Sequence, residues 1–239
     1  MNIVVQRYDG RVECRPDTSW EREDKDLYAP DFVSGYLYSP VLFARISKAG
    51  KCIGSKFAAR YYDAVNYGVL LYASICDPFP ENAVCKDGMT DILPRELSPA
   101  NENDVPGGDT GESTGLSSVM DHTSVLPFPM YDKITLGSGK NEFRICLDAG
   151  PVSGKEENAA GDRIVFNTSC GSTELIEKAL CHISEFVSLR IGDIIAVELA
   201  SQDILVSRKD CRKTDGNVTT TRLYGSFCGN TSFDFNIIM

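Results

Sequence analysis

A histidine with polar neighbours is the clearest candidate for chemistry in this sequence. His122 lies in the segment Asp121-His122-Thr123-Ser124, and a histidine beside a carboxylate or a hydroxyl group can act as a general base. The alternative is a solvated loop histidine with no catalytic role. The second histidine, His182, follows Cys181 in a helical pattern, where neighbouring side chains point about 100° apart and cannot form a dyad. We therefore take His122 as the candidate catalytic residue.

The residues alone do not predict a metal centre. The nine cysteines are irregularly spaced and include no Cys-x-x-Cys pair, so they do not indicate a zinc site. Four cations among the six residues from Arg208 to Lys213 form a basic run. This run is typical of a solvated loop, with a site for an anionic ligand as the alternative.

Charge and composition argue against several classes of protein. The 239 residues include 34 acidic and 24 basic side chains, for a net charge of −10, which repels nucleic acid and anionic membrane surfaces. The start, MNIVVQRYDG, lacks the features of a signal peptide, and the apolar run over residues 67–75 is too short to span a membrane. We expect a single soluble domain over residues 1–239, in the cytoplasm, with no nucleic-acid or membrane partner.

The elements that would position these residues begin with β-rich segments. Asp9-Gly10 separates two short β-prone runs and predicts a hairpin, and residues 16–30 form a polar linker in which Trp20 is an expected anchor. Residues 1–34 are thus an N-terminal hairpin and linker. We then predict a strand over Gly35–Ile46, a helix from Ser55 to about Val65 and a buried strand over Val69–Ile75.

A long polar segment, residues 78–124, interrupts this pattern. It is rich in Gly, Ser, Asn, Asp and Pro, and its length indicates a loop or a lid. The elements predicted beyond it are strands over Ile134–Leu136, Glu142–Leu147, Arg163–Asn167, Asp193–Leu199, Ile204–Val206, Thr219–Phe227 and Phe233–Ile237, and a helix from Ser172 or Thr173 to about Val187. Two helices against roughly ten strands predict an α+β fold dominated by one large β structure.

Three stretches resemble the fumarylacetoacetate hydrolase family. The best match is His182 to Ile195, HISEFVSLRIGDII, where the family has a helix ending in Ile-Ser and then Leu-x-x-Gly-Asp-Val-Ile. Leu42 to Ile53 is similar to the family segment Glu-x-Glu-Leu-x-x-x-Ile-x-Lys-x-Gly-Lys-x-Ile. Tyr67-Gly68-Val69 and Tyr131-Asp132 are similar to its Gly-Tyr strand and its Lys-x-Phe-Asp segment. The resemblance covers residues 35–239.

This resemblance implies both a fold and a chemistry. The fold is the family's mixed β-roll or barrel-like C-terminal domain with few helices, usually in a homodimer. The chemistry uses Mg²⁺, Mn²⁺ or Ca²⁺, held by carboxylates at the mouth of the barrel. The metal polarises a 1,3-dicarbonyl or acylpyruvate oxygen while a C–C bond is hydrolysed, decarboxylated or isomerised.

The sequence departs from the family pattern at the positions of the metal ligands. If Leu42 takes the place of the family leucine, the two preceding glutamates fall on Ser39 and Val41. The metal-binding aspartate falls on Tyr72, or on Leu70 in another register. None of these side chains carries a negative charge, and a hard cation is held weakly by neutral ligands.

The other catalytic positions are also replaced. The active-site lysine falls on Pro129, and the substrate-contacting Gly-Thr-Pro loop falls on Glu198-Leu199-Ala200. Glu198 is therefore a new acid near the expected mouth, either binding a cationic ligand or lying as a solvated or ion-paired strand residue. Asp132 remains acidic, as in the family, with turn hydrogen bonding as its expected role.

Three functions follow, and we favour the first. It is a pseudoenzyme that needs no metal and binds a small molecule or a partner subunit, as a homodimer. The second is an active hydrolase, isomerase or decarboxylase whose Mg²⁺, Mn²⁺ or Ca²⁺ is held by other acids, such as Asp77, Asp121, Asp132 or Glu198. The third is a structural partner of an intact paralogous subunit, with residues 78–124 as the interface.

Overall fold

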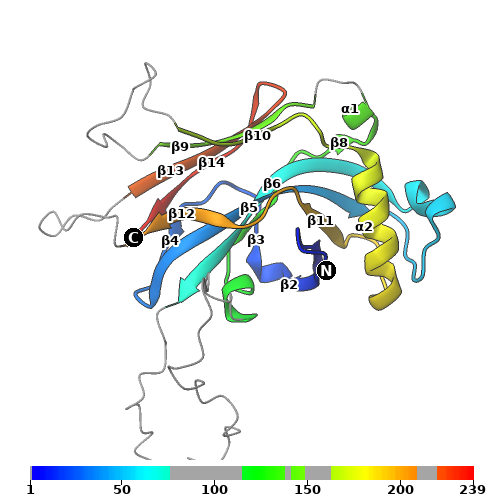
Figure 1. The fold of residues 1–239 in the computed structure, drawn as a ribbon, viewed down its shortest axis with the longest axis horizontal. Coiled ribbons are helices and arrows are strands. Elements are labelled where there is room, and N and C mark those ends of the chain that lie inside the picture. Colours follow the sequence, from blue (N-terminus) through cyan, green and yellow to red (C-terminus); the bar gives the residue numbers. More distant parts are fainter. Residues whose placement is uncertain (1, 76–114, 138–140, 149–162, 209–219) are drawn as a thin grey trace, which may run out of the picture.

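The chain folds into two β-sheets with few helices (Figure 1). The computed structural model describes residues 2–75, 115–137, 141–148, 163–208 and 220–239. The nine-stranded sheet holds β1 (Asn2–Gln6), β2 (Val12–Pro16), β3 (Trp20–Glu21), β5 (Val33–Ile46), β6 (Tyr62–Ile75), β7 (Ser124–Val125), β8 (Tyr131–Asp132), β11 (Ile194–Glu198) and β12 (Asp203–Ser207). The five-stranded sheet holds β4 (Leu27–Tyr28), β9 (Phe143–Asp148), β10 (Arg163–Thr168), β13 (Thr220–Phe227) and β14 (Asn230–Ile238). The helical elements are η1 (Asp17–Ser19), η2 (Ser55–Arg60), η4 (Gly115–Ser118), α1 (Ile134–Gly137) and α2 (Thr173–Phe186).

The nine-stranded sheet curls until it is nearly a closed barrel. Its strand order is β2-β1-β11-β5-β6-β7-β3, and the two end strands, β2 and β3, are consecutive in the chain and joined by η1. Arg15 on β2 spans the seam, since its Nη1 donates to the carbonyl of Leu71 on β6 and to Ser124 Oγ on β7. Closure of this kind removes exposed sheet edges. The predicted N-terminal hairpin is confirmed, and it forms part of the barrel wall.

Alternation along β5 separates two apolar cores. Tyr36, Tyr38 and Leu42 belong to the larger core, which includes residues of both sheets. Val41 and Phe43 belong to a second core inside the barrel, with Ile3, Trp20, Leu70, Tyr72 and Ile194 among its other members. Because successive strand residues point to opposite faces, one long strand serves both cores.

The second predicted helix is confirmed as α2. Ser172 caps it, since its side chain accepts a hydrogen bond from the N–H of Leu175. Ile176, Leu180 and Ile183 on its apolar face are fully buried in the larger core. Phe186 was predicted on the same face, but it is 63% exposed at the helix end.

Other predicted elements are wrong in type or length. The helix expected from Ser55 to about Val65 is only the short turn η2, because the chain from Tyr62 onward pairs with β5. The strand expected over residues 134–136 is instead the short helix α1. The N–H of Ile134, its first residue, donates to Asp132 Oδ1. Within the linker of residues 16–30, the chain forms β3 and β4. Residues 76–114 of the expected loop or lid lie outside the described residues.

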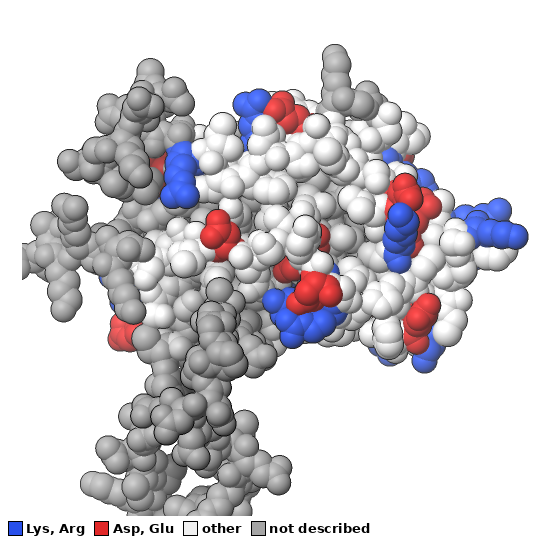
Figure 2. All heavy atoms as spheres, viewed as in Figure 1, with Lys and Arg blue, Asp and Glu red and all other residues white. Residues whose placement is uncertain are grey.

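The helices and the charged surface were also compared with what membrane and nucleic-acid partners would require. No helix in the described part of the chain is long and apolar enough to cross a membrane. Figure 2 shows one face, on which the described lysine and arginine side chains lie singly or beside acidic ones, with no basic stripe.

Buried tyrosines predict a loss of stability at high pH. Burial raises the pKa of Tyr36 and of Tyr67 from 10.0 to about 12, and it also raises the pKa values of Tyr38, Tyr62 and Tyr72. Such a tyrosine holds its proton more tightly in the folded chain, so its stabilising effect is full below about pH 10 and is lost as the pH rises toward 12.

We therefore expect the urea midpoint to fall between about pH 10 and 12. Tyrosinate absorbance of the folded protein should rise in two phases, because the exposed tyrosines ionise first. A single phase near pH 10 with unchanged stability would contradict this account.

Candidate functional site

Three of the predicted ligand positions and the new acid lie on one face of the nine-stranded sheet. In the β5–β6 register Ser39 is opposite Leu70, and Leu37 is opposite Tyr72, which places Ser39, Val41 and Tyr72 on the same face. Glu198 on β11 is opposite Val41. This face lines the barrel interior, and all four side chains are buried.

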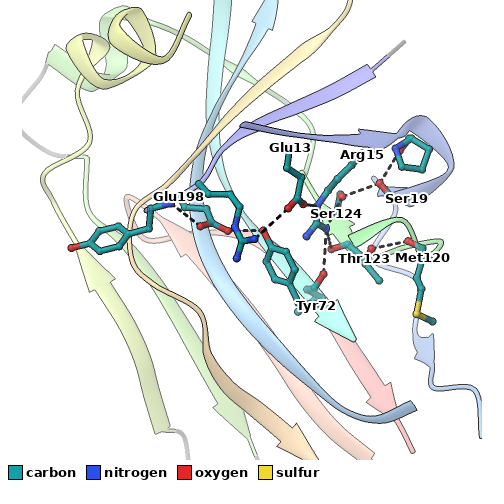
Figure 3. Close-up of polar contacts among 12 residues, drawn as sticks. Glu13, Arg15, Ser19, Tyr72, Met120, Thr123, Ser124 and Glu198 are labelled. Atoms are coloured by element: carbon teal, nitrogen blue, oxygen red, sulfur yellow. Dashed lines mark hydrogen bonds and ion pairs between the residues drawn. The ribbon is translucent and has the colours of Figure 1, made fainter. Parts of the chain in front are cut away.

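Glu198 has both carboxylate oxygens engaged in hydrogen bonds (Figure 3). The hydroxyl of Tyr72 donates to Oε1 at 2.5 Å, and the backbone N–H of Tyr8 donates to Oε2 at 2.9 Å. Burial raises the pKa of Tyr72, and Glu198 adds to that effect against Arg15, so the phenol is neutral and is the donor. Ser39 donates its hydroxyl to the carbonyl of Ala200 at 2.9 Å. Both oxygens of Glu198 and the hydroxyl hydrogen of Ser39 are therefore engaged in hydrogen bonds within the fold.

Arg15 is buried beside these residues and makes five close contacts. Its guanidinium carbon lies 4.3 Å from the centre of the Tyr72 ring, and its Nε donates to Glu13 Oε1 at 3.0 Å. Its Nη1 lies 3.2 Å from the carbonyl oxygen of Leu71, 3.3 Å from that of Thr123 and 3.2 Å from Ser124 Oγ. The side chain is 0% exposed. A buried guanidinium with this many acceptors is held in one position.

A second arginine completes the interior network, the name used here for Arg7, Glu13, Arg15, Tyr72 and Glu198. The guanidinium carbon of Arg7 lies 5.6 Å from the Tyr72 ring centre, and its Nη1 lies 3.8 Å from Glu13 Oε2. Two cations therefore face two carboxylates. Among the described residues, Arg7 Nε and Arg15 Nη2 are buried and have no hydrogen-bond partner, so the network has spare donors.

The residues of the interior network do not fit a divalent metal. Mg²⁺, Mn²⁺ and Ca²⁺ need about six or more oxygen ligands, whereas Glu198 is already bonded through both oxygens and Val41 offers none. The nearby guanidinium groups repel a divalent cation. Among the residues that the structure describes, no group of three or more His, Cys, Asp or Glu side chains could hold an ion.

Three of the predicted pocket residues lie outside the interior network. Leu199 packs against the larger core, and its N–H donates to the carbonyl of Pro40. Pro129 is exposed, and its carbonyl accepts from Asn66 Nδ2 at 3.0 Å. Asp132 is also exposed, and its Oδ1 accepts from the N–H of Ile134, which is the turn role expected for it.

His122 makes a hydrogen-bond contact with a residue that the sequence did not indicate. Its Nδ1 lies 2.6 Å from Glu21 Oε2, whereas the partners suggested by the sequence were Asp121 and Ser124. Ser124 instead contacts Ser19 Oγ and Arg15. The pairing of β3 with β7 places Trp20 opposite Ser124 and so brings Glu21 near His122.

Glu21 remains ionised at neutral pH. Burial is the largest single influence and raises its pKa, but the hydrogen bonds from Glu23 N–H, His122 and Arg22 N–H together lower that pKa below its ordinary value. A carboxylate accepts and cannot donate, so Nδ1 of His122 carries a proton. Nε2 of a neutral His122 is then an acceptor. This arrangement of an acid orienting a histidine can support general-base chemistry.

Comparison with solved structures identifies the fold. A fumarylacetoacetate hydrolase family protein from Yersinia pestis has a TM-score of 0.57 and 16% identity, over 99% of this chain and 92% of that one. Fumarylpyruvate hydrolase from Pseudomonas aeruginosa, in complex with Mn²⁺ and pyruvate, has a TM-score of 0.59 and 14% identity, over 100% and 90%. The 5-carboxymethyl-2-hydroxymuconate delta-isomerase from Mycobacterium smegmatis has a TM-score of 0.59 and 12% identity, over 99% and 78%.

These likenesses confirm the predicted α+β, barrel-like fold of the fumarylacetoacetate hydrolase type. No protein-family model and no curated protein sequence matches the chain. At 12–16% identity the solved structures establish the fold and leave the chemistry to be argued from the residues.

Proposed function

We propose that this chain is a catalytically silent protein of the fumarylacetoacetate hydrolase fold, retained to bind a small molecule. One observation carries the proposal. The positions that match the family's metal ligands, Ser39, Val41 and Tyr72, lie on the inner face of the barrel, where Glu198 accepts a hydrogen bond from Tyr72 and the buried Arg15 lies over the Tyr72 ring. The proposal includes a homodimer in the cytoplasm and no bound metal.

The physical reason is the sign of the charge in the barrel interior. A hard cation is stabilised by converging carboxylates, and here the carboxylates of Glu13 and Glu198 are matched by the guanidinium groups of Arg7 and Arg15. A guanidinium carries a permanent positive charge. It can therefore balance the charge of a carboxylate, as a metal cation would, but it is not a Lewis acid. This arrangement stabilises the fold and supplies no metal Lewis acid to polarise a dicarbonyl substrate.

The alternative is an active hydrolase, isomerase or decarboxylase acting on a 1,3-dicarbonyl or acylpyruvate with Mg²⁺, Mn²⁺ or Ca²⁺. The Glu21–His122 pair favours it, because a carboxylate-oriented histidine is a competent general base. The Pseudomonas enzyme of similar fold binds Mn²⁺ and pyruvate. Of the acids expected to hold a metal in this case, Glu198 is buried with a hydrogen bond to each oxygen, Asp121 and Asp132 are exposed, and Asp77 lies outside the described residues.

Metal binding and turnover separate the two functions. We expect purified protein to contain no stoichiometric divalent metal, to shift its melting temperature by less than about 1 °C with Mg²⁺, Mn²⁺ or Ca²⁺, and to leave acylpyruvates intact. The Pseudomonas fumarylpyruvate hydrolase, assayed in parallel, is the positive control. A bound ion together with metal-dependent cleavage of an acylpyruvate would overturn the proposal in favour of the alternative.

A further inference from the structure

A run of cations without acids lies between β5 and β6. Residues 47–61, which form the turn after β5 and the helix η2, contain Lys48, Lys51, Lys56 and Arg60 and no Asp or Glu. All four residues are exposed, and none forms an ion pair within the described part of the chain. In Figure 1 this segment, coloured between blue and cyan, lies at the end of the molecule beside α2. Such a segment, in a chain of net charge −10, indicates a surface for an anionic partner.

The contacts of two further groups bring these cations together at the C-terminal end of η2. Lys48 donates its N–H to the carbonyl of Tyr61 at 3.3 Å, and its ammonium nitrogen lies 5.2 Å from the centre of the Tyr61 ring. Lys133, which follows β8, donates its ammonium group to the carbonyl of Ala59. Arg60 lies between these two contact residues in the chain. The name basic patch is used here for Lys48, Lys51, Lys56, Arg60 and Lys133.

Two exposed apolar side chains lie within the basic patch. Phe57 is 53% exposed and Ile134 is 76% exposed. Phe57 and Arg60 share one side of η2, because residues three apart eclipse each other in a 3₁₀ helix, and the guanidinium carbon lies 5.6 Å from the Phe57 ring centre. Ile134 directly follows Lys133, whose contact with Ala59 brings it beside η2. The surface therefore offers apolar contact as well as positive charge.

The acids around the basic patch are fewer, and some are already paired. On β6, Asp63 pairs with Arg45 at 2.9 Å, and on α2, Glu174 pairs with Lys178 at 2.7 Å. The adjoining segments also carry one more cation and three more acids, namely Arg190, Asp132, Glu177 and Glu185. Positive charge therefore prevails at the patch, and acids lie at its border.

This distribution of charge favours a short acidic segment over an extended polyanion. Charge interactions in solvent fade over about 8 Å at physiological ionic strength, so a short segment on the basic patch interacts mainly with its cations. A membrane surface or a nucleic-acid duplex extends further and also approaches the acids at the border, in a chain of net charge −10. The exposed Phe57 adds a contact for an apolar side chain of the segment.

We propose that the basic patch is a docking surface for an acidic segment of a partner protein, in which an aromatic side chain stands among carboxylates. The carboxylates pair with Lys48, Arg60 and the neighbouring cations, and the aromatic ring packs on Phe57. The inference is independent of the small-molecule binding proposed above, and it involves no metal and no covalent step.

Fluorescence anisotropy with three labelled peptides tests the inference on the full-length chain. The probe is fluorescein-EEFEEFEE-amide, and its two counterparts are EESEESEE, which lacks the aromatic rings, and QQFQQFQQ, which lacks the charges. We expect saturable binding of the probe, weakened about tenfold when the salt concentration rises from about 50 to about 300 mM. EESEESEE should bind about fivefold more weakly than the probe, and QQFQQFQQ at least about tenfold more weakly.

Two variants of the basic patch separate charge from apolar contact. Lys48→Glu combined with Arg60→Glu should weaken the probe by about tenfold or more. The matched control combines Lys25→Glu with Arg144→Glu, which changes the net charge equally at side chains that are 60% and 46% exposed, and it should bind with wild-type affinity. Phe57→Ser should weaken the probe but leave the affinity for EESEESEE unchanged. Because the replaced side chains are exposed, all these variants should melt near the wild-type temperature.

Three results would overturn the inference. The first is no saturable binding of the probe, and the second is an equal loss of binding in the two double variants, which would assign it to net charge alone. The third is binding to phosphatidylserine vesicles or to a DNA duplex that is lost in the Lys48→Glu and Arg60→Glu variant, without binding of the probe. That result would reassign the patch to an extended polyanion. None of these outcomes affects the metal and acylpyruvate tests of the proposed function.

Discussion

Replacing Arg15 by methionine is expected to lower the free energy of unfolding by about 3–5 kcal/mol, since removing one partner of a buried charged network has effects of this size. The side chain is 0% exposed and bonds to Glu13, to the carbonyls of Leu71 and Thr123 and to Ser124. Methionine fills a similar volume but donates no hydrogen bond. The variant therefore leaves these acceptors unpaired and removes the contacts that link β2 to β6 and β7 across the seam.

Chemical denaturation of Arg15→Met measures this effect, with Arg11→Met as the matched control on the same hairpin. The Arg11 side chain is 69% exposed and pairs with Asp9 in solvent, so its replacement should leave the urea midpoint near that of the wild type. An Arg15→Met variant as stable as Arg11→Met would show that the interior network does not hold the barrel closed.

Replacing Trp20 by alanine is expected to cost about 3–5 kcal/mol of unfolding free energy, as for other large aromatic residues removed from a core. Trp20 is 8% exposed and packs among the residues of the barrel core. Its indole N–H donates to the carbonyl of Leu126 at 2.8 Å, and its ring stacks on Phe128 with centroids 5.6 Å apart. The variant loses burial, stacking and the hydrogen bond at the end strand β3.

Two further variants separate these contributions. Trp20→Phe keeps much of the apolar contact and loses the N–H donor, so it should fall between the wild type and Trp20→Ala in a urea titration. Arg22→Ala removes a guanidinium that lies 3.8 Å from the Trp20 ring centre, and as an exposed cation–π partner it should have a small effect. If Arg22→Ala destabilised the protein as much as Trp20→Ala, the anchoring role of the indole would be wrong.

Local patterns predicted much of this fold because each strand carries its own signal. The Asp9-Gly10 turn, the apolar run at residues 69–75 and the Ser172 cap each depend on neighbours in the chain. The two-residue strands β3 and β4 are too short for periodicity to show. The residues after Arg60 have helical spacing, but pairing with β5 decides their conformation.

The candidate site was predictable only in part, because its contacts join distant segments. The family register placed Ser39, Val41 and Tyr72 together, and the strand pairing puts them on one face. Nothing local in the sequence connects these residues. Glu198 is 126 residues from Tyr72, and Arg15 is 56 residues from Leu71, the neighbour of Tyr72.

The partner of His122 illustrates the same limit. Glu21 is 101 residues earlier in the chain, and the pairing of β3 with β7 brings the two together. Asp121 and Ser124 were nearer in sequence, but Ser124 is turned toward Ser19 and Arg15. A polar residue next to a histidine in sequence is therefore a weak guide to its partner in the fold.

An anomalous difference map from a crystal soaked in Mn²⁺ tests the central claim most directly. The claim is that the buried guanidinium of Arg15, with Tyr72 and Glu198, occupies the place where this fold would otherwise hold a metal. We predict no manganese peak within bonding distance of Glu198 and an intact contact between Tyr72 and Glu198. A manganese ion bound to Glu198, with Arg15 displaced from the Tyr72 ring, would contradict it.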